Sequence, residues 1–379
     1  MNKYFIILAA AALTLSAACT KVVTDEAPAK KISFEVASYV AAPTKAANTS
    51  FPGTGGSLFN ELSSPKFYTY AYFYPESGTQ GQTFMDNVEI VPNGATSAAT
   101  TEWAPAVEYF WPKTGYVNFF SYASKNAITP TVTNLESSKQ ISFSKTIVAD
   151  DNILLADACY NAKASNSSES TMTVTGETTV GVPTLFRHLL CQVKFQFKLA
   201  SSKAHPNTTY EVVLNSASIN DIASTGTLAL TNAGTSGTGL TTVDWGTSGT
   251  VGWTPTSGDE DITFTVSSSA VTLATSATAV AHESSVVTLL DFRTFMPQTL
   301  SNDVVLNLGY TVRAKHSSTT YSEETITVTG LKLNTGTLGV WNMNEKITYT
   351  IIIDPVTTIV TFDPAVDAWD TSKSGSITI

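Results

Sequence analysis

The sequence predicts an all-β protein built from antiparallel β-sandwiches. Apolar and polar residues alternate in short runs, and turn-forming residues separate these runs. Only 14% of the residues are charged, and Thr, Ser, Ala and Val fill the chain in their place, as is typical of exposed β-structure. No stretch of helical period is long enough for the crossovers that a parallel sheet requires. We therefore expect antiparallel sheets throughout.

The chain begins with a secretory signal. An apolar run over residues 4–15 is too short to span a bilayer, and the small residues Ser16-Ala17-Ala18 lead to Cys19. Bacterial lipoprotein processing acts on this arrangement. We expect a lipoprotein signal peptide over residues 1–18 and acyl chains, palmitate among them, on Cys19. The alternative is an ordinary signal peptide that is cut near Ala17-Ala18.

Residues 19–31 are polar, show no periodicity and are expected to form a tether. The chain has no second hydrophobic span, so the lipid on Cys19 would be its only hold on the membrane. The net charge of −10 argues against nucleic acid as a partner, because phosphate binding needs basic patches. We therefore expect a protein that leaves the cytoplasm and is held at a membrane by its lipid.

Two sandwiches are expected, the first over residues 32–182 and the second over residues 183–379. The first begins with the alternating residues Ile32, Phe34 and Val36, and it includes the aromatic run 67–74. Aromatic side chains occupy both faces of that run. A Ser/Thr/Gly-rich stretch over residues 162–179 interrupts the pattern, and we place the domain boundary at its end.

Three alternating runs dominate the second sandwich, at residues 262–266, 304–312 and 347–353. A low-complexity region over residues 231–256 lies between the strands. Because the strand pattern resumes after it without a change of composition, we expect a long loop or a hairpin there and not a linker.

The sequence predicts no enzyme, no cofactor and no metal site. It has neither a Gly-x-Ser-x-Gly elbow nor a phosphate-binding glycine loop. His282-Glu283 begins a zinc-protease pattern, but Val286 stands where the second histidine belongs. We interpret His188 as a hydrogen-bonded histidine at a domain junction and not as a ligand or base. The acidic run 259–261 is interpreted as a solvated turn and not as a calcium loop.

The remaining cysteines, Cys159 and Cys191, do not form a disulfide framework. We expect two buried free thiols, and the alternative is a single disulfide formed in an oxidising compartment. Four tryptophans adjoin strand-like sequence and are expected to pack in cores: Trp103, Trp111, Trp341 and Trp369. We expect Trp111 in the first core and Trp369 in the second. Carbohydrate stacking is the alternative for these side chains.

Several short motifs, taken in order, resemble those of the Bacteroides-type fimbrillins, the subunits of type V pili and their tip and anchor relatives. The resemblance runs through most of the chain after Cys19. The motifs are Tyr109-Phe110-Trp111-Pro112 with Gly115 and the strand 117–123, Asp151 with Ile153-Leu154-Leu155-Ala156, Phe186-x-His188-Leu189 with Val193 and Phe195, Met296-Pro297-Gln298, and the ending Trp341, Asn344, Tyr349, Ile351, Ile353, Ile359, Phe362, Val366 and Trp369.

This resemblance implies two β-sandwich domains of transthyretin-like topology, export as an outer membrane lipoprotein, and a structural or adhesive role at the cell surface. In the family a protease removes an N-terminal segment, and a neighbouring subunit donates a strand to the groove that is freed. The family's cut is arginine-specific, but the arginines here are Arg187, Arg293 and Arg313. Lys30, Lys31 and Lys45 are the basic candidates after the tether begins, and we take Lys45, in a polar stretch, as the candidate processing site.

We expect a fimbrial subunit of the stalk, or a tip or accessory subunit. It would polymerise with other subunits by β-strand addition, adhere to a host or bacterial surface ligand, or do both. The alternative is a monomeric surface lipoprotein that binds glycans through exposed aromatic side chains. Removal of residues 20–45 should permit oligomers only in the first case. If residues 32–36 are instead a permanent edge strand, strand exchange fails.

Overall fold

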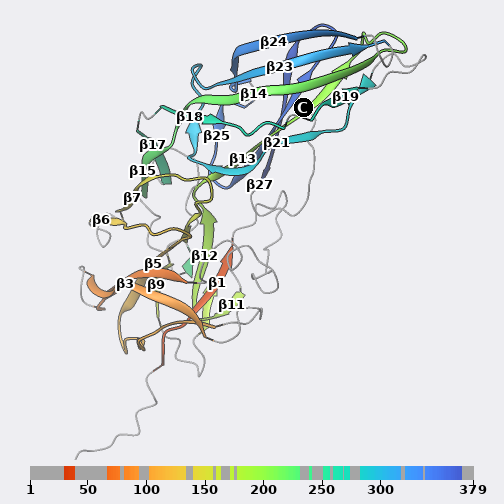
Figure 1. Ribbon diagram of the computed structural model, residues 1–379. Helices are drawn as coiled ribbons and strands as arrows, with labels where there is room; N and C mark the ends of the chain where they lie inside the picture. The colour runs from red at the N-terminus through yellow and green to blue at the C-terminus, as the bar shows by residue number, and fades with distance from the viewer. Residues whose placement is uncertain are drawn as a thin grey trace, which may run out of the picture.

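The computed structural model describes residues 30–38, 66–76, 81–93, 102–133, 140–156, 159–163, 171–174, 177–230, 239–240, 251–256, 259–267, 269–273, 282–316, 321–335 and 338–368. Within these ranges the regular structure consists of β-strands (Figure 1). The expectation of an all-β fold is confirmed. No helix in the described ranges is long and apolar enough to cross a membrane.

The strands of the N-terminal half are β1 (Phe34–Ser38), β2 (Phe67–Tyr74), β3 (Gln82–Asn93), β4 (Glu102–Pro105), β5 (Tyr116–Ser124), β6 (Thr131–Thr133), β7 (Gln140–Thr146), β8 (Ile153–Ala156), β9 (Cys159–Ala162), β10 (Thr171–Val174), β11 (Glu177–Val180) and β12 (Val182–His188). Those of the C-terminal half are β13 (Cys191–Ser201), β14 (Thr209–Ala223), β15 (Thr225–Leu230), β16 (Gly239–Leu240), β17 (Val251–Pro255), β18 (Asp259–Thr263), β19 (Val271–Leu273), β20 (His282–Glu283), β21 (Val287–Phe295), β22 (Gln298–Thr299), β23 (Val305–Lys315), β24 (Tyr321–Lys332), β25 (Val340–Trp341), β26 (Glu345–Ile353) and β27 (Val360–Ala368).

The first sheet closes on itself. Its strands follow the order β5-β2-β3-β4-β1-β12-β8, and β8 also pairs with β5, which completes the circuit. An apolar cluster that includes Phe34, Phe67, Trp103, Phe119 and Phe186 fills the inside. This cluster is the core of the N-terminal half.

Aromatic residues occupy both faces of β2 and β5 because both faces are covered. Phe67 and Phe119 point into the closed sheet, whereas the alternate residues Tyr70 and Tyr122 point outward into a second apolar cluster. On the outward face Tyr122 stacks on Tyr68, with ring centroids 5.5 Å apart. Both faces of β2 and β5 are therefore apolar because each face packs into a different core.

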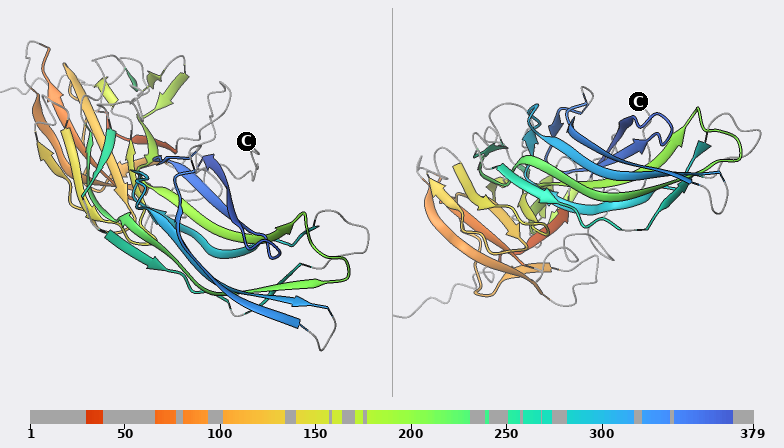
Figure 2. Two further views of the ribbon diagram at one scale, coloured as in Figure 1. Left: turned by 90° about the horizontal axis from the view of Figure 1, so that it is seen from above. Right: turned by 45° about the horizontal axis from the view of Figure 1, so that its top comes forward.

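A bridging sheet, in the order β17-β15-β7-β6, covers that outward face. β7 precedes the expected domain boundary, and β15 follows it. Residues 141–146 of β7 pair antiparallel with residues 225–230 of β15, with Phe143 opposite Leu228. Both side chains belong to the second cluster, together with Leu190 and Met296. The halves lie end to end (Figure 2), and this sheet fastens one to the other.

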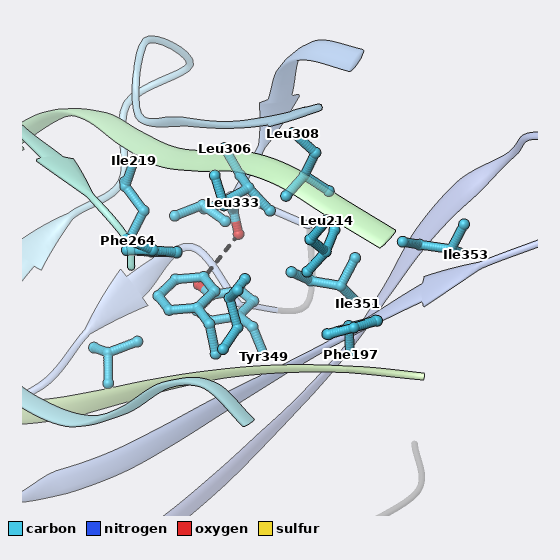
Figure 3. Packing of buried hydrophobic residues seen from close by; sticks show 14 of the residues in the cluster. Phe197, Leu214, Ile219, Phe264, Leu306, Leu308, Leu333, Tyr349, Ile351 and Ile353 are labelled. Atoms are coloured by element: carbon cyan, nitrogen blue, oxygen red, sulfur yellow. Dashed lines mark hydrogen bonds between the residues drawn. The ribbon is translucent and has the colours of Figure 1, made fainter. Parts of the chain in front are cut away.

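The C-terminal half is a sandwich of two sheets. One follows the order β20-β13-β26-β27, with β21 also paired to β13, and the other follows β18-β14-β23-β24, with β19 also paired to β14. The apolar side chains of both sheets meet between them (Figure 3). Tyr349 lies in this core, stacks on Phe195 at 5.1 Å between centroids, and donates a hydrogen bond to the carbonyl oxygen of Leu333 at 3.3 Å.

Among the described strands two pairs are parallel, contrary to the expectation of antiparallel sheets throughout. β1 runs parallel to β12, and β13 runs parallel to β26. The expectation assumed that parallel neighbours need helical crossovers. Here the chain between the partners of each pair forms other strands of the fold, so no helix is needed.

The expected boundary between residues 182 and 183 falls within β12. Every strand that pairs with β12 belongs to the N-terminal half, namely β1 and β8.

The expected loop or hairpin over residues 231–256 contains β16 and β17, and β17 pairs with β15. The acidic run 259–261 lies in β18, so its interpretation as a turn was wrong. The division into two independently folding units stays a prediction.

Candidate assembly site

The N-terminal strand β1 lies between two strands and not at an edge. On one side it pairs in parallel with β12, from Phe34 opposite Val182 to Ser38 opposite Phe186. On the other side Phe34 pairs with Trp103 of β4. In the described part of the chain, the alternative of a permanent edge strand at residues 32–36 is therefore wrong.

Backbone hydrogen bonds hold the residues that lead into β1. The amide of Ile32 donates to the carbonyl oxygen of Tyr109 at 2.8 Å, and the amide of Trp111 donates to that of Lys30 at 2.9 Å. The amide of Val182 donates to the carbonyl oxygen of Ser33 at 2.7 Å. The segment thus bonds alternately to both neighbours and closes the circuit of the first sheet.

The side chains of β1 form part of the core. Ile32, Phe34 and Val36 are all buried, as their alternation predicts. The ring of Phe34 stands edge-on to those of Phe67 and Phe119, at centroid distances of 5.5 and 5.7 Å. Edge-to-face contacts of this kind add to the energy of burial. We call the space that Ile32, Phe34 and Val36 fill the β1 slot.

A groove continues from the slot at the end where β1 begins. Its volume is about 450 Å³, and it is lined by Lys31, Ile32, Val91, Pro92, Ala104, Pro105, Ala106, Glu108 and Tyr109. Lys31 forms an ion pair with Glu108 at its rim, where both side chains are exposed. The groove leaves apolar surface of β3 and β4 open beside the entering strand.

Gly181 sets the close approach between β1 and β12. Its φ is +108°, and a Cβ atom there would lie 2.9 Å from the carbonyl oxygen of Ser33. Only glycine adopts this conformation readily. The turn into β12 therefore needs glycine at the point where it contacts the N-terminal segment.

The Tyr-Phe-Trp-Pro motif forms one wall of this site. Trp111 is 6% exposed and packs edge-on against Phe119 at 5.9 Å. Its indole nitrogen is buried without a hydrogen-bond partner in the described structure. The expectation that Trp111 packs in the first core is confirmed, whereas Trp369 lies outside the described residues.

Two further motifs meet where β8 and β12 pair. His188 is buried opposite Leu154, and its Nδ1 lies 2.9 Å from Oδ1 of Asn152. The backbone amide of the next residue, Leu189, donates to the carbonyl oxygen of Ile153 at 2.9 Å. The interpretation of His188 as a hydrogen-bonded histidine is confirmed.

The Met-Pro-Gln motif braces the bridging sheet. The side chain of Gln298 accepts a hydrogen bond from the amide of Ala223 at 3.1 Å and donates one to the carbonyl oxygen of the same residue at 3.2 Å. Met296 packs beneath Gly226, whose missing Cβ would lie 2.7 Å from its sulfur atom. These contacts hold the corner between β14 and β15.

The described residues hold no gathered set of exposed aromatic side chains. Phe110, Phe292 and Tyr321 are the exposed aromatic residues, at 41%, 39% and 55%, and they lie before β5, on β21 and on β24. Trp103 and Trp341 are buried. In this part of the chain, the side chains proposed for carbohydrate stacking serve the cores instead.

The described residues show no cluster of metal-ligating side chains. No three of their His, Cys, Asp and Glu side chains gather as metal ligands would. Cys159 and Cys191 are free and buried, as expected. Burial raises the pKa of the Cys159 thiol to about 12. Burial, with the charge of Glu345, raises the pKa of Cys191 well above its ordinary value.

The expected lipidation and processing residues, Cys19 and Lys45, lie outside the described residues, as does the rest of the tether before Lys30. The sequence did not predict that β1 pairs in parallel with β12, since period-two patterns do not give strand direction. It also missed the buried charge at Asp151 and Lys145. Lys145 carries a usable signal, because it stands at an inward position between Phe143 and Ile147.

One solved structure matches this chain over nearly the whole length of both proteins. A fimbrial protein from Bacteroides vulgatus is 17% identical, with a TM-score of 0.52 over 90% of this chain and 99% of that one. The chain shares its fold with a bacterial fimbrial protein. At this identity the likeness shows the fold alone.

Two other solved structures are more distant. A candidate cell adhesion protein from Bacteroides uniformis is 13% identical, with a TM-score of 0.37 over 91% of this chain and 99% of that one. The fimbrial anchor protein Mfa2 from Porphyromonas gingivalis is 10% identical, with a TM-score of 0.29 over 89% and 98%. No model of a protein family matches the chain, and no curated protein matches it.

Proposed function

We propose that this chain is a structural or adhesive subunit of a cell-surface fimbria. It is exported as a lipoprotein precursor. It assembles when proteolysis cuts the chain beyond β1 and a strand of a neighbouring subunit then displaces β1 from the β1 slot. The observation that carries the proposal is the place of β1, the first described strand, between β4 and β12. The fold that the chain shares with a fimbrial protein supports it.

Loss of β1 would open the first sheet at one place. The backbone groups of β4 and β12 would lose their partners, and the aromatic wall around Phe34 would lie open. An incoming strand with apolar residues at alternate positions would restore both the hydrogen bonds and the packing. The groove beside Lys31 extends the surface available to that strand.

Cleavage alone should not eject β1. Burial of Ile32, Phe34 and Val36 contributes about 1.5–3 kcal/mol for each side chain. A cut beyond Ser38 would leave this interaction in place but would remove the covalent link that returns the strand to its slot. The cut chain is therefore a stable intermediate that awaits a competing strand.

The lipid on Cys19 would hold the precursor at the outer membrane. We expect that Cys19→Ala yields a precursor without lipid and without a stable hold on the membrane, because lipid is the only anchor that the sequence offers. Metabolic labelling with a palmitate analogue measures this. Label that persists on the variant would show that the acyl chains are attached elsewhere.

Limited trypsin digestion tests assembly. The first cut should fall at Lys45, and the product should associate with cognate subunits while the uncut chain does not. Lys45→Gln should abolish both effects. Lys163→Gln, a change at an exposed lysine beyond β9, is the matched control and should abolish neither. A cut chain that stays monomeric with its partners present would overturn strand exchange and favour a monomeric surface lipoprotein.

A further inference from the structure

Lys145 stands at an inward position of the bridging sheet. Along β7 and the residue that follows it, Phe143, Lys145 and Ile147 share one face, and the two apolar neighbours are buried in the second cluster. The lysine side chain is only 14% exposed. A lysine at such a position needs a partner, because burying an unpaired ammonium group is costly.

The partner is the fully buried carboxylate of Asp151. Its Oδ1 lies 3.1 Å from Nζ of Lys145, and the same oxygen accepts a hydrogen bond from Nδ2 of Asn126 at 2.7 Å. Its Oδ2 accepts a hydrogen bond from the backbone amide of Val148 at 2.8 Å. The carboxylate is therefore fixed in place, and one of its oxygens joins an amine to a side-chain amide.

This arrangement brings together an amine, a carboxamide and a group that can carry protons between them. The lysine nitrogen is a nucleophile once it has lost a proton, and Oδ1 of Asp151 is placed to accept that proton. The same oxygen already contacts the amide nitrogen of Asn126, which would be the leaving group. All three side chains come from segments that the fold itself holds in place.

We propose that Lys145 and Asn126 form an intramolecular isopeptide bond with Asp151 as the proton carrier. The neutral amine of Lys145 attacks Cγ of Asn126, so that a bond forms between Nζ and Cγ and the bond between Cγ and Nδ2 breaks. Asp151 passes the protons released by the amine to the departing nitrogen. Ammonium leaves, the carboxylate is regenerated, and the reaction needs no oxidant, reductant or cofactor.

The bond would add a covalent cross-link between two parts of the fold that packing, hydrogen bonds and an ion pair now hold together. Asn126 follows β5 of the closed sheet, and Lys145 lies on β7 of the bridging sheet. A covalent link there would tie the N-terminal core to the sheet that also contains β15. This inference does not depend on the fimbrial role, since the chemistry takes place within one chain.

Intact mass spectrometry of the purified full chain tests the proposal. Lys145→Arg is the matched control, because arginine keeps the positive charge beside Asp151 but lacks a nucleophilic amine. Parent and variant share the same N-terminus, so the mass difference between them does not depend on where the chain is processed. The substitution alone sets one mass difference between the two chains, and the parent should be lighter than that by the mass of one ammonia. Tryptic digestion of the parent should give a branched peptide that joins residues 126 and 145. Asn126→Ala should remove the deficit too.

Three results would overturn the proposal. The first is a parent whose mass differs from that of Lys145→Arg by the substitution alone, which would leave Lys145 and Asp151 as an ion pair. The second is a deficit of one water, which would indicate an amide between Lys145 and Asp151. The third is an ammonia loss located at Asn126 in the tryptic peptides of Lys145→Arg, because it would come from cyclisation of that asparagine with its own backbone.

Discussion

Gly115 occupies a position at the entry of β5 that other residues do not fit. Its φ is +81°, and a Cβ atom there would lie 2.3 Å from the carbonyl oxygen of Tyr74. The obstacle is backbone of a paired strand, since Tyr74 lies opposite Tyr116. We expect Gly115→Ala to lower the free energy of unfolding by about 1–3 kcal/mol or more.

Denaturant melts measure this effect. Gly252→Ala is the matched control, because Gly252 is exposed and nothing lies within 4 Å of the position of its Cβ. That variant should unfold close to the parent. Equal midpoints for both variants would show that the turn before β5 can shift to accommodate a side chain.

The two described thiols should be inert while the protein is folded. Burial raises the pKa of Cys159 to about 12 and raises that of Cys191 as well, so that almost no thiolate is present near pH 8. The thiolate is the reactive form. In a Cys19→Ser background we expect no reaction with Ellman's reagent until denaturant is added. Reaction of the native chain at the rate of the unfolded one would contradict this burial.

At the scale of the strand, the sequence predicts which residues are buried better than it predicts strand direction. The alternating runs 304–312 and 347–353 correspond closely to β23 (Val305–Lys315) and β26 (Glu345–Ile353). Alternation reports which side chains share a buried face, and it is the same for parallel and antiparallel neighbours. The parallel pairing of β26 with β13 therefore left no trace in the pattern.

The assembly site was predictable in part for the same reason. The alternation of Ile32, Phe34 and Val36 identifies a strand with one buried face, and the structure confirms it. That β1 lies between two partners depends on contacts with residues near 103 and 182, which are far away in the sequence. Local pattern carries no information about such distant pairing.

Strand exchange predicts opposite effects for two buried phenylalanines. Phe34 belongs to β1, whereas Phe119 is the wall against which it packs. Truncation to alanine should cost about 3–5 kcal/mol of stability at either site. After cleavage at Lys45, however, Phe34→Ala should speed association with cognate subunits, because the resident strand leaves more readily.

Phe119→Ala should instead weaken association, since the slot that receives the new strand has lost a wall. Light scattering of the cut chains, mixed with cognate subunits, gives both rates. The uncut variants serve as controls for folding. If both truncations change the rate in the same direction, β1 is not the strand that is exchanged, although the fimbrial role could still hold.

At the scale of the whole molecule, composition predicts the fold class but not how the halves are joined. The bridging sheet takes β6 and β7 from before the expected boundary and β15 and β17 from after it. Further bonds cross the boundary, such as that from the backbone amide of Thr294 to the carbonyl oxygen of Ala149 at 3.0 Å. A boundary drawn from a change in composition cannot detect a sheet that both halves share.

This shared sheet predicts how the chain behaves when it is split at the expected boundary. The fragment 32–182 would lack most of β12, so its first sheet could not close, and Phe143 would lose Leu228 as its neighbour. The fragment 183–379 would expose Leu190 and Met296. We expect neither fragment alone to unfold cooperatively, because each leaves strands unpaired and apolar side chains in water.

Near-UV circular dichroism and thermal melts of the separate and mixed fragments measure this. Moving the cut to follow Leu190 is the matched comparison, because fragment 32–190 regains β12 and with it the closed circuit. That fragment should be more ordered than 32–182, yet still less stable than the intact chain, since β7 lacks β15. If 32–182 and 183–379 each melt cooperatively with parent-like spectra, the bridging sheet is dispensable and the halves are independent domains.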